Sequence, residues 1–222
     1  PGIAMAQSVG AANLVGGIQD AWFATVPVIA LTGKKFPSHQ YKNAYQECDH
    51  KALYEGVTKF NAEVADAQQL PFLIRQCYRE AVTGKPRPVH LDIPGLAAIE
   101  TEMSEITEAF RAEPIFGKYP PFRLQAEPEL VTLAAQMLSK SRKPVIVIGR
   151  GAYISGAGEA IARLAEKCDI PVVTSPDGKT VFDESDSRWC GIVGAYGMDC
   201  ANRTVKSADL VIFIGTQAAD QT

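Results

Sequence analysis

The sequence predicts an α/β fold made of two doubly wound units, each with a mostly parallel β-sheet. Short apolar runs without alternation, such as residues 26–31 and 145–148, are typical of strands buried on both faces of a parallel sheet. Segments with helical periodicity separate these runs, as crossovers between parallel strands require. A proline-bearing stretch at 97–125, acidic in its first part, interrupts the alternation and indicates two units.

This stretch divides the chain into residues 1–96, a linker at 97–125 and residues 126–222. Such stretches are common boundaries between domains. We expect both units to be truncated, because the strand–helix alternation is already under way at Pro1 and stops just beyond a strand end at Thr222. In open parallel sheets, strand ends are where ligands usually bind.

The first unit begins with a short strand and a turn at residues 8–10 that leads into a helix. Small residues along this helix allow it to pack closely against a sheet or another subunit. Gly84 suits the position that follows the C-terminus of a long amphipathic helix. The predicted elements are strand 3–7, helix 12–23, strand 26–31 ended by Gly33, loop 34–43, helix 49–55, strand 57–60, helix 65–82 and strand 89–93.

The second unit repeats the alternation of helix and strand. Its first helix is amphipathic, with an apolar face made of Leu130, Leu133, Ala134, Met137 and Leu138. The predicted elements are helix 127–140, strand 145–148, turn 149–151, helix 157–167, strand 170–174, loop 175–179, helix 200–206 and strand 210–215.

Composition and charge are ordinary for a globular chain. The 222 residues are 46% hydrophobic and 21% charged, with a formal net charge of −3. Because no basic block is present, the sequence predicts neither a nucleic-acid partner nor an anionic membrane surface. The longest apolar runs are far shorter than a membrane span.

The cysteines and histidines predict no metal site in this chain. Five cysteines are scattered without a Cys-x-x-Cys pair, which is typical of free thiols in a reducing compartment, so we expect a cytoplasmic protein. His39, His50 and His90 show no ligand spacing. Because His90 alternates with apolar residues in a predicted strand, we interpret it as structural rather than catalytic, and Asp92 beside it as a hydrogen-bond acceptor.

Polar and small residues at predicted strand ends of the second unit are candidate nucleotide contacts. Gly149 and Gly151 flank Arg150, but the dinucleotide fingerprint requires a third glycine where Ile154 stands. Two interpretations stay open: a tight strand-to-helix turn, or backbone amides that bind a phosphate or flavin diphosphate. The possible nucleotide contacts are Gly149, Gly151, Thr174, Gly194 and Gly215.

In the first unit, Gln46 lies in a predicted polar loop after a buried strand. Its amide could donate and accept hydrogen bonds to a ligand without titrating. From local chemistry alone, a solvated turn at residues 46–47 is the favoured interpretation, and packing is favoured over chemistry for Tyr45.

Four motifs occur in a fixed order along the chain. They are residues 8–13 (Ser-Val-Gly-Ala-Ala-Asn), residues 44–47 (Ala-Tyr-Gln-Glu), residues 83–94 (Thr-Gly-Lys-Pro-Arg-Pro-Val-His-Leu-Asp-Ile-Pro) and residues 143–151 (Lys-Pro-Val-Ile-Val-Ile-Gly-Arg-Gly). Together they resemble the thiamine diphosphate-dependent enzymes of the acetolactate synthase and pyruvate decarboxylase type, over nearly the whole chain. By this resemblance, residues 1–96 are the later part of a pyrimidine-binding domain, and residues 126–222 are the first part of a Rossmann-like central domain.

The resemblance implies a role for each residue of the first two motifs. Val9, Gly10 and Asn13 would lie beside the aminopyrimidine ring of the cofactor. Gln46 would reach the reacting end of the cofactor, with Tyr45 beside it. In that family, the glutamate that activates the cofactor lies upstream of the segment matching Pro1. The motif for magnesium and the diphosphate lies in a third domain. The full enzyme would therefore bind thiamine diphosphate and Mg²⁺, and we expect this chain alone to be inactive.

Four positions depart from the acetolactate synthase pattern. Gly95 stands where those enzymes carry a lysine, and Lys85 replaces an arginine that contacts flavin. Tyr196 replaces a histidine, and Gln217 corresponds to an arginine. These differences argue against bound FAD, which stays an alternative, and against acetolactate synthesis itself. Val9, in place of the family's proline, favours a decarboxylase.

The resemblance thus implies a transferase or lyase that decarboxylates or cleaves a 2-keto acid or a related carbonyl compound. A homodimer or homotetramer is implied, because the cofactor in that family lies between two subunits. The alternative is a non-catalytic nucleotide- or flavin-binding scaffold module, suggested by the turn at residues 149–151 and by the missing glutamate and magnesium motifs.

Overall fold

The structure is a computed structural model that describes residues 1–95, 105–107 and 109–219. The chain forms two compact units, Pro1–Arg123 and Leu124–Thr222, each described here by itself. Every strand pairing among the described residues is parallel, which confirms the predicted α/β class. The domain boundaries at 96 and 126 stay predictions, and residues 96–104 of the predicted linker lie outside the described residues.

A four-stranded sheet forms the centre of the first unit, in the order β1-β2-β4-β3. Its strands are β1 (Gly2–Gln7), β2 (Val28–Lys34), β3 (Asn61–Glu63) and β4 (Val89–Pro94). The two central strands carry mostly apolar residues, as strands covered on both faces do. Their register places Thr32 of β2 beside Asp92 of β4.

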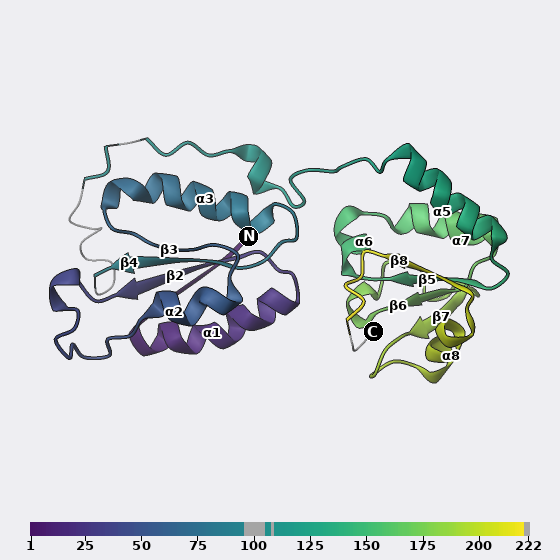
Figure 1. The fold of residues 1–222 in the computed structure, drawn as a ribbon, viewed down its shortest axis with the longest axis horizontal. Coiled ribbons are helices and arrows are strands. Elements are labelled where there is room, and N and C mark those ends of the chain that lie inside the picture. Colours follow the sequence, from purple (N-terminus) through teal and green to yellow (C-terminus); the bar gives the residue numbers. More distant parts are fainter. Residues whose placement is uncertain (96–104, 108, 220–222) are drawn as a thin grey trace. The chain divides into compact units, whose positions relative to one another are not determined.

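Helices cover both faces of this sheet, as Figure 1 shows. They are α1 (Ser8–Phe23), α2 (His50–Tyr54) and α3 (Leu70–Val82), with short 3₁₀ turns at Pro37–His39, Glu55–Val57, Ala67–Gln69 and Pro114–Gly117. Because successive strand residues point to opposite faces, Ala30 of β2 packs with α1 and α2, while Ile29 packs with α3.

The second unit has the same layered plan. Its sheet has the order β7-β6-β5-β8. The elements are α5 (Pro128–Lys140), β5 (Pro144–Ile148), α6 (Arg150–Ser155), α7 (Gly158–Cys168), β6 (Val172–Thr174), a 3₁₀ turn at Pro176–Gly178, β7 (Trp189–Ile192), α8 (Asp199–Ser207) and β8 (Leu210–Ile214). Ile146 of β5 packs in the cluster that includes α7, and Val147 packs in the cluster that includes α8.

Three local predictions for the first unit are wrong. The predicted turn at residues 8–10 is helical, because β1 passes directly into α1 through Ser8, whose φ is 51°. β2 continues past Gly33, because Lys34 still pairs with β4. The strand expected at 57–60 is instead β3, because Val57 ends a 3₁₀ turn and the Thr58 hydroxyl donates to the carbonyl of Tyr54.

In the second unit, α6 and β7 are not among the predicted elements. α6 has six residues, too few for a periodic pattern, and Gly191 interrupts the apolar pattern of β7. α5 is helical as expected, but Leu130, Leu133 and Met137 of its predicted apolar face are exposed. Among the described residues, no helix is both long enough and apolar enough to cross a membrane.

Part of the predicted linker packs against the first unit. Phe116 and Tyr119 contact the apolar cluster beneath α3, and the Arg79 guanidinium donates two hydrogen bonds to the Glu113 carboxylate. The guanidinium lowers the pKa of Glu113 through these hydrogen bonds. Residues 113–119 therefore belong structurally to the first unit.

Tyr54 joins α2 to α1 and to the sheet. Its ring is fully buried and stacks on the His90 ring, with centroids 3.9 Å apart, and its hydroxyl donates to the Ala11 carbonyl at 2.8 Å. Burial, assisted by the negative charge of Asp92, raises the pKa of Tyr54 to about 12. The phenol therefore stays protonated as a donor at physiological pH.

We expect Tyr54→Phe to lower the free energy of unfolding by about 1 kcal/mol, because it removes one buried hydrogen bond and keeps the ring. Urea denaturation at pH 7 measures the change. Tyr41→Phe is the matched control, since Tyr41 is 97% exposed. Equal midpoints for the two variants would contradict the prediction.

Candidate functional site

The start of α1 presents three of the predicted cofactor contacts. β1 and β2 are parallel neighbours, so their carboxyl ends lie at one edge of the sheet. Val9, Gly10 and Asn13 lie in the first turns of α1, directly after β1, and all three are exposed. The Val9 side chain, the backbone at Gly10 and the Asn13 amide are therefore all accessible at this edge of the sheet.

The segment 35–49 between β2 and α2 carries Tyr45 and Gln46; we call it the Gln46 loop. Both side chains are exposed, and the Gln46 amide donates to the Tyr45 hydroxyl at 3.1 Å. Tyr41, Asn43 and Gln46 all have left-handed backbone conformations, with φ between 52° and 61°. Such conformations are costly for residues other than glycine, and they cluster at functional sites.

The Gln46 loop is closed by hydrogen bonds of its own. The Glu47 carboxylate accepts from the backbone N–H of Tyr41 at 2.9 Å, and the Glu47 N–H donates to the Ala44 carbonyl at 3.0 Å. Glu47 thus ties together the exposed turn that presents Gln46. In this structure, Glu47 holds the loop, and the neighbouring amide is left exposed.

Beneath this edge lies a buried polar cluster, which we call the His90 cluster and define as Thr32, His50, Asn61, His90 and Asp92. The Thr32 hydroxyl donates to the Asp92 carboxylate at 2.5 Å, and the same carboxylate oxygen lies 3.1 Å from Nδ1 of His50. The His90 ring nitrogens lie 2.7 Å from the Thr32 hydroxyl and 2.8 Å from the Asn61 carbonyl oxygen. His90 is thus a buried histidine with a polar neighbour at each ring nitrogen, and Asp92 is an acceptor, as the sequence predicts.

Burial dominates the electrostatics of this cluster. It lowers the pKa of His90 to about 4; the nearby charge of His50 acts in the same direction and that of Asp92 opposes it. His90 is therefore neutral at physiological pH. The sequence analysis does not identify Thr32 or His50 as members, because no local pattern indicates that side chains 58 and 42 residues apart along the chain meet.

In the second unit, the predicted nucleotide contacts Gly149, Gly151 and Gly215 lie together where β5 and β8 end. The N–H of Gly151 donates to the Gly215 carbonyl at 2.7 Å, and a Cβ added to Gly149 would lie 2.4 Å from Cα of Thr216. Here the close neighbour of each glycine is the protein's own backbone. The observation accounts for a tight strand-to-helix turn; a nucleotide contact at these residues stays a prediction.

Thr174 and Gly194 lie at the ends of the neighbouring strands. Thr174 ends β6, and its buried hydroxyl has no hydrogen-bond partner among the residues that the structure describes. Gly194 follows β7 with a φ of 123°, and its N–H and C=O both bond to the Asn202 side chain. The five candidates of this unit therefore lie at or just after the ends of its four strands.

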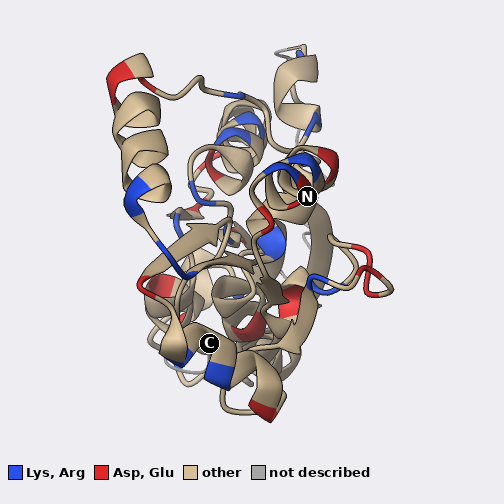
Figure 2. Cartoon of the chain, turned by 90° about the vertical axis from the view of Figure 1, so that its right-hand side faces the viewer, with Lys and Arg blue, Asp and Glu red and all other residues tan. Residues whose placement is uncertain are grey.

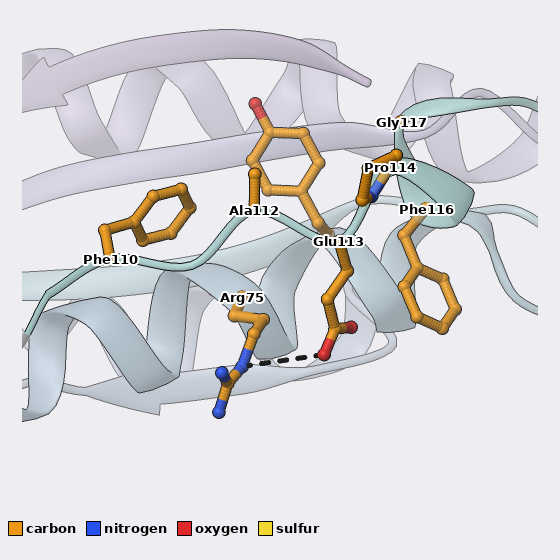
Figure 3. Close-up of a pocket in the computed structure, with 8 residues that line it drawn as sticks. Arg75, Phe110, Ala112, Glu113, Pro114, Phe116 and Gly117 are labelled. Carbon is orange, nitrogen blue, oxygen red and sulfur yellow. Dashed lines mark ion pairs between the residues drawn. The ribbon is translucent and has the colours of Figure 1, made fainter.

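A pocket of about 250 Å³ lies between α3 and the segment that follows the undescribed residues (Figure 3). Its wall is mostly apolar, and Nε of Arg75 lies 4.0 Å from Oε1 of Glu113. The lining residues are Arg75, Tyr78, Phe110, Ala112, Glu113, Pro114, Phe116 and Gly117. None of the predicted site residues lines this pocket.

Charged residues of both signs are spread over the helices and loops (Figure 2). The described residues contain no group of three or more His, Cys, Asp or Glu side chains that could hold a metal ion. The predicted contacts at the first-unit edge are the Asn13 and Gln46 amides, the Tyr45 phenol, the Val9 side chain and the Gly10 backbone. They suit an uncharged hydrogen-bonding ring such as an aminopyrimidine. For the magnesium–diphosphate end of a cofactor, they offer no matching group.

Comparison with known proteins decides the family. The family model described as "Thiamine pyrophosphate enzyme, central domain" matches residues 131–222. The probable acetolactate synthase large subunit of Methanocaldococcus jannaschii is 36% identical over 214 residues, which is 96% of this chain. The chain belongs to the thiamine pyrophosphate-dependent enzyme family, and it is similar to acetolactate synthase.

Two other relatives match the chain over nearly all of its length. The acetolactate synthase large subunit of Lactococcus lactis is 31% identical over 212 residues, or 96% of the chain. The catalytic subunit of the mitochondrial enzyme of Saccharomyces cerevisiae is 30% identical over 234 residues, or 100% of the chain. The chain spans 36%, 36% and 33% of the lengths of these three relatives. The similarity thus covers both units of the chain but about a third of each relative.

Proposed function

We propose that this chain forms part of an enzyme that uses thiamine diphosphate to decarboxylate a 2-keto acid, or to join its two-carbon unit to an acceptor, as an acetolactate synthase-like transferase or lyase. The observation that carries the proposal is the similarity to acetolactate synthase large subunits over both units of the chain. The exposed polar groups at the first-unit edge support it, because they suit the cofactor's pyrimidine ring.

Each exposed group would have a distinct task. Val9 and the backbone at Gly10 would pack against the ring, and the Asn13 amide would bond to a ring substituent. The Gln46 amide would orient the reacting carbonyl compound without exchanging a proton, because an amide does not titrate. The Tyr45 hydroxyl, which accepts from Gln46, would fix the direction of that amide. When bound, thiamine diphosphate supplies the carbanion chemistry.

We further propose that a second subunit covers this edge, in a homodimer or homotetramer. The exposed apolar side chains of Ile3, Met5 and Val9, all on or beside β1, support a covered surface. A cytoplasmic location and a Mg²⁺ requirement belong to the same proposal. FAD stays doubtful, since Lys85 and Gln217 replace the arginines expected to contact it.

The test uses the full-length gene product, stripped of cofactor and assayed with pyruvate and other 2-keto acids, with and without thiamine diphosphate and Mg²⁺. We expect turnover only when the cofactor is added. Gln46→Ala is expected to lower kcat at least about 10-fold, because a misplaced reacting group costs this much or more. Its melting temperature should stay close to that of the parent, since the Gln46 side chain is exposed.

Lys42→Ala is the matched control, because Lys42 is an exposed residue of the same loop. It should leave kcat unchanged. Turnover that does not depend on thiamine diphosphate would refute the proposed function, and unchanged kinetics of Gln46→Ala would remove Gln46 from the site.

A further inference from the structure

The Gln46 loop combines exposure with backbone strain. Three of its residues other than glycine hold left-handed conformations. Each such residue costs free energy that surrounding contacts must offset if the conformation is to persist. The hydrogen bonds made by Glu47 close the turn on itself but do not join it to the sheet. A contact that joins the turn to the sheet must therefore come from other residues of the segment.

The downstream end of the loop supplies such a contact. The Asp49 side chain accepts from the backbone N–H of Ala52 and caps α2, so the chain direction is fixed at this point. The next residue, His50, is 2% exposed and turns its side chain inward, with Nδ1 3.1 Å from the Asp92 carboxylate. Only three residues, 47–49, therefore separate Gln46 from His50 and its buried attachment to the sheet.

Asp92 is itself held by the most buried part of the sheet. It lies on β4 and is 2% exposed, and the Thr32 hydroxyl of β2 donates to it. Thr32 in turn contacts His90, which is stacked on Tyr54. Because these groups lie on the two central strands and the facing helix, Asp92 has little freedom to move. A hydrogen bond to Asp92 transmits that rigidity to its partner.

The two ring nitrogens of His50 have different surroundings. Nδ1 meets Asp92, whereas Nε2 is buried without a hydrogen-bond partner among the described residues. The contact with Asp92 is thus made by Nδ1, the nitrogen bonded directly to Cγ. Asparagine can place an N–H close to the position of Nδ1, and glutamine places its N–H near Nε2. Substituting His50 by asparagine or by glutamine therefore tests which of its two ring nitrogens the loop depends on.

We propose that the His50–Asp92 pair is a positioning device that fixes the Gln46 loop to the sheet and so sets where the Gln46 amide stands. His50 acts through Gln46 and is not itself a catalytic residue. The expected effect on turnover rests on the proposed function, whereas the expected effect on the mobility of the loop does not.

The test compares His50→Asn with His50→Gln in the full-length protein by hydrogen exchange. We expect His50→Gln to speed exchange of the backbone amides of residues 41–47 about 10-fold, because a buried hydrogen bond to a charged acceptor is lost. His50→Asn should keep exchange within about 3-fold of the parent. The amides of β2 and β4 should be unchanged in both variants.

Thr58→Val controls for general destabilisation, since it removes a buried hydrogen bond from the same unit outside the loop. It should not speed exchange in residues 41–47. Equal exchange in the asparagine and glutamine variants, or the same effect in Thr58→Val, would overturn the proposal.

Kinetics give a second readout. His50→Gln should lower kcat about 10-fold while the KM for the keto acid changes little, because the bound substrate meets a misplaced Gln46. His50→Asn should restore most of the parent kcat. Faster loop exchange in His50→Gln with unchanged kcat would overturn the link to Gln46. If the parent shows no turnover that depends on thiamine diphosphate, the proposed function fails while the exchange result still decides the positioning role.

Discussion

Gly178→Ala is expected to destabilise the second unit by about 3 kcal/mol, the upper part of the range for overpacking a close-packed interior. A Cβ added to Gly178 would lie 2.2 Å from the carbonyl oxygen of Ile148 and 3.1 Å from Cα of Gly149. These neighbours are backbone atoms at the end of β5, so no side chain can move aside. The turn cannot withdraw freely either, because the Ser175 N–H donates to the same Ile148 carbonyl at 2.8 Å.

Urea denaturation followed by fluorescence measures this effect. The chain has two tryptophans, so a Trp22→Phe background leaves Trp189 to report on the second unit. Gly156→Ala is the control: its φ is 65°, but nothing lies within 4 Å of the added Cβ, so it should cost about 1 kcal/mol. A loss for Gly178→Ala no larger than that of Gly156→Ala would show that the turn at 176–178 can relax.

The stability of the first unit is expected to fall by about 2 kcal/mol between pH 7 and pH 5 because of His90 alone. Burial lowers the pKa of His90 to about 4 from an ordinary value of 6.5. In this window the unfolded chain binds a proton at this histidine that the folded chain does not bind. The contribution is therefore fully present above pH 6.5 and is lost as the pH falls toward 4.

The measurement is the free energy of unfolding at several pH values in a Trp189→Phe background, with Trp22 reporting on the first unit. His90→Gln is expected to remove this part of the pH dependence, whatever its effect on stability at pH 7. The groups that face His90 are Asp92, His50 and Tyr54, and they stay in place in this variant. His39→Gln, at an exposed position, should keep the parent slope. A parent-like slope in His90→Gln would mean that His90 is protonated in the folded chain.

The order of motifs predicts the family, and the apolar runs predict the parallel sheets. β2 and β5 could be predicted because strands covered on both faces need uninterrupted apolar residues, a property that short segments show by themselves. The strand predicted at 57–60 illustrates the limit, because a hydrogen bond from Thr58 to the preceding helix decides where β3 begins. The start of α1 shows a similar limit, because the left-handed conformation of Ser8 lets β1 pass directly into the helix without the predicted turn.

The candidate site divides in the same way. Asn13 and Gln46 are singled out by the sequence, because each belongs to a short motif whose residues are adjacent; their contacts with a cofactor stay predictions. His50 is not singled out, because its partner Asp92 is 42 residues away and only the packing of α2 against β4 brings the two together. For Gly149 and Gly151, the sequence pattern indicates a special turn. The structure shows that the backbone of residues 215–216 lies too close to leave room for a Cβ at either position.

The sequence by itself thus determined the class of fold and the family, and it singled out motif residues that lie at the first-unit edge. These depend on local periodicity and on contiguous motifs. Only the tertiary structure decided that a buried polar cluster lies beneath that edge and that His50 joins the Gln46 loop to it. Burial of polar groups requires partners from different strands and helices, and which groups become partners is set when the sheet and its covering helices pack.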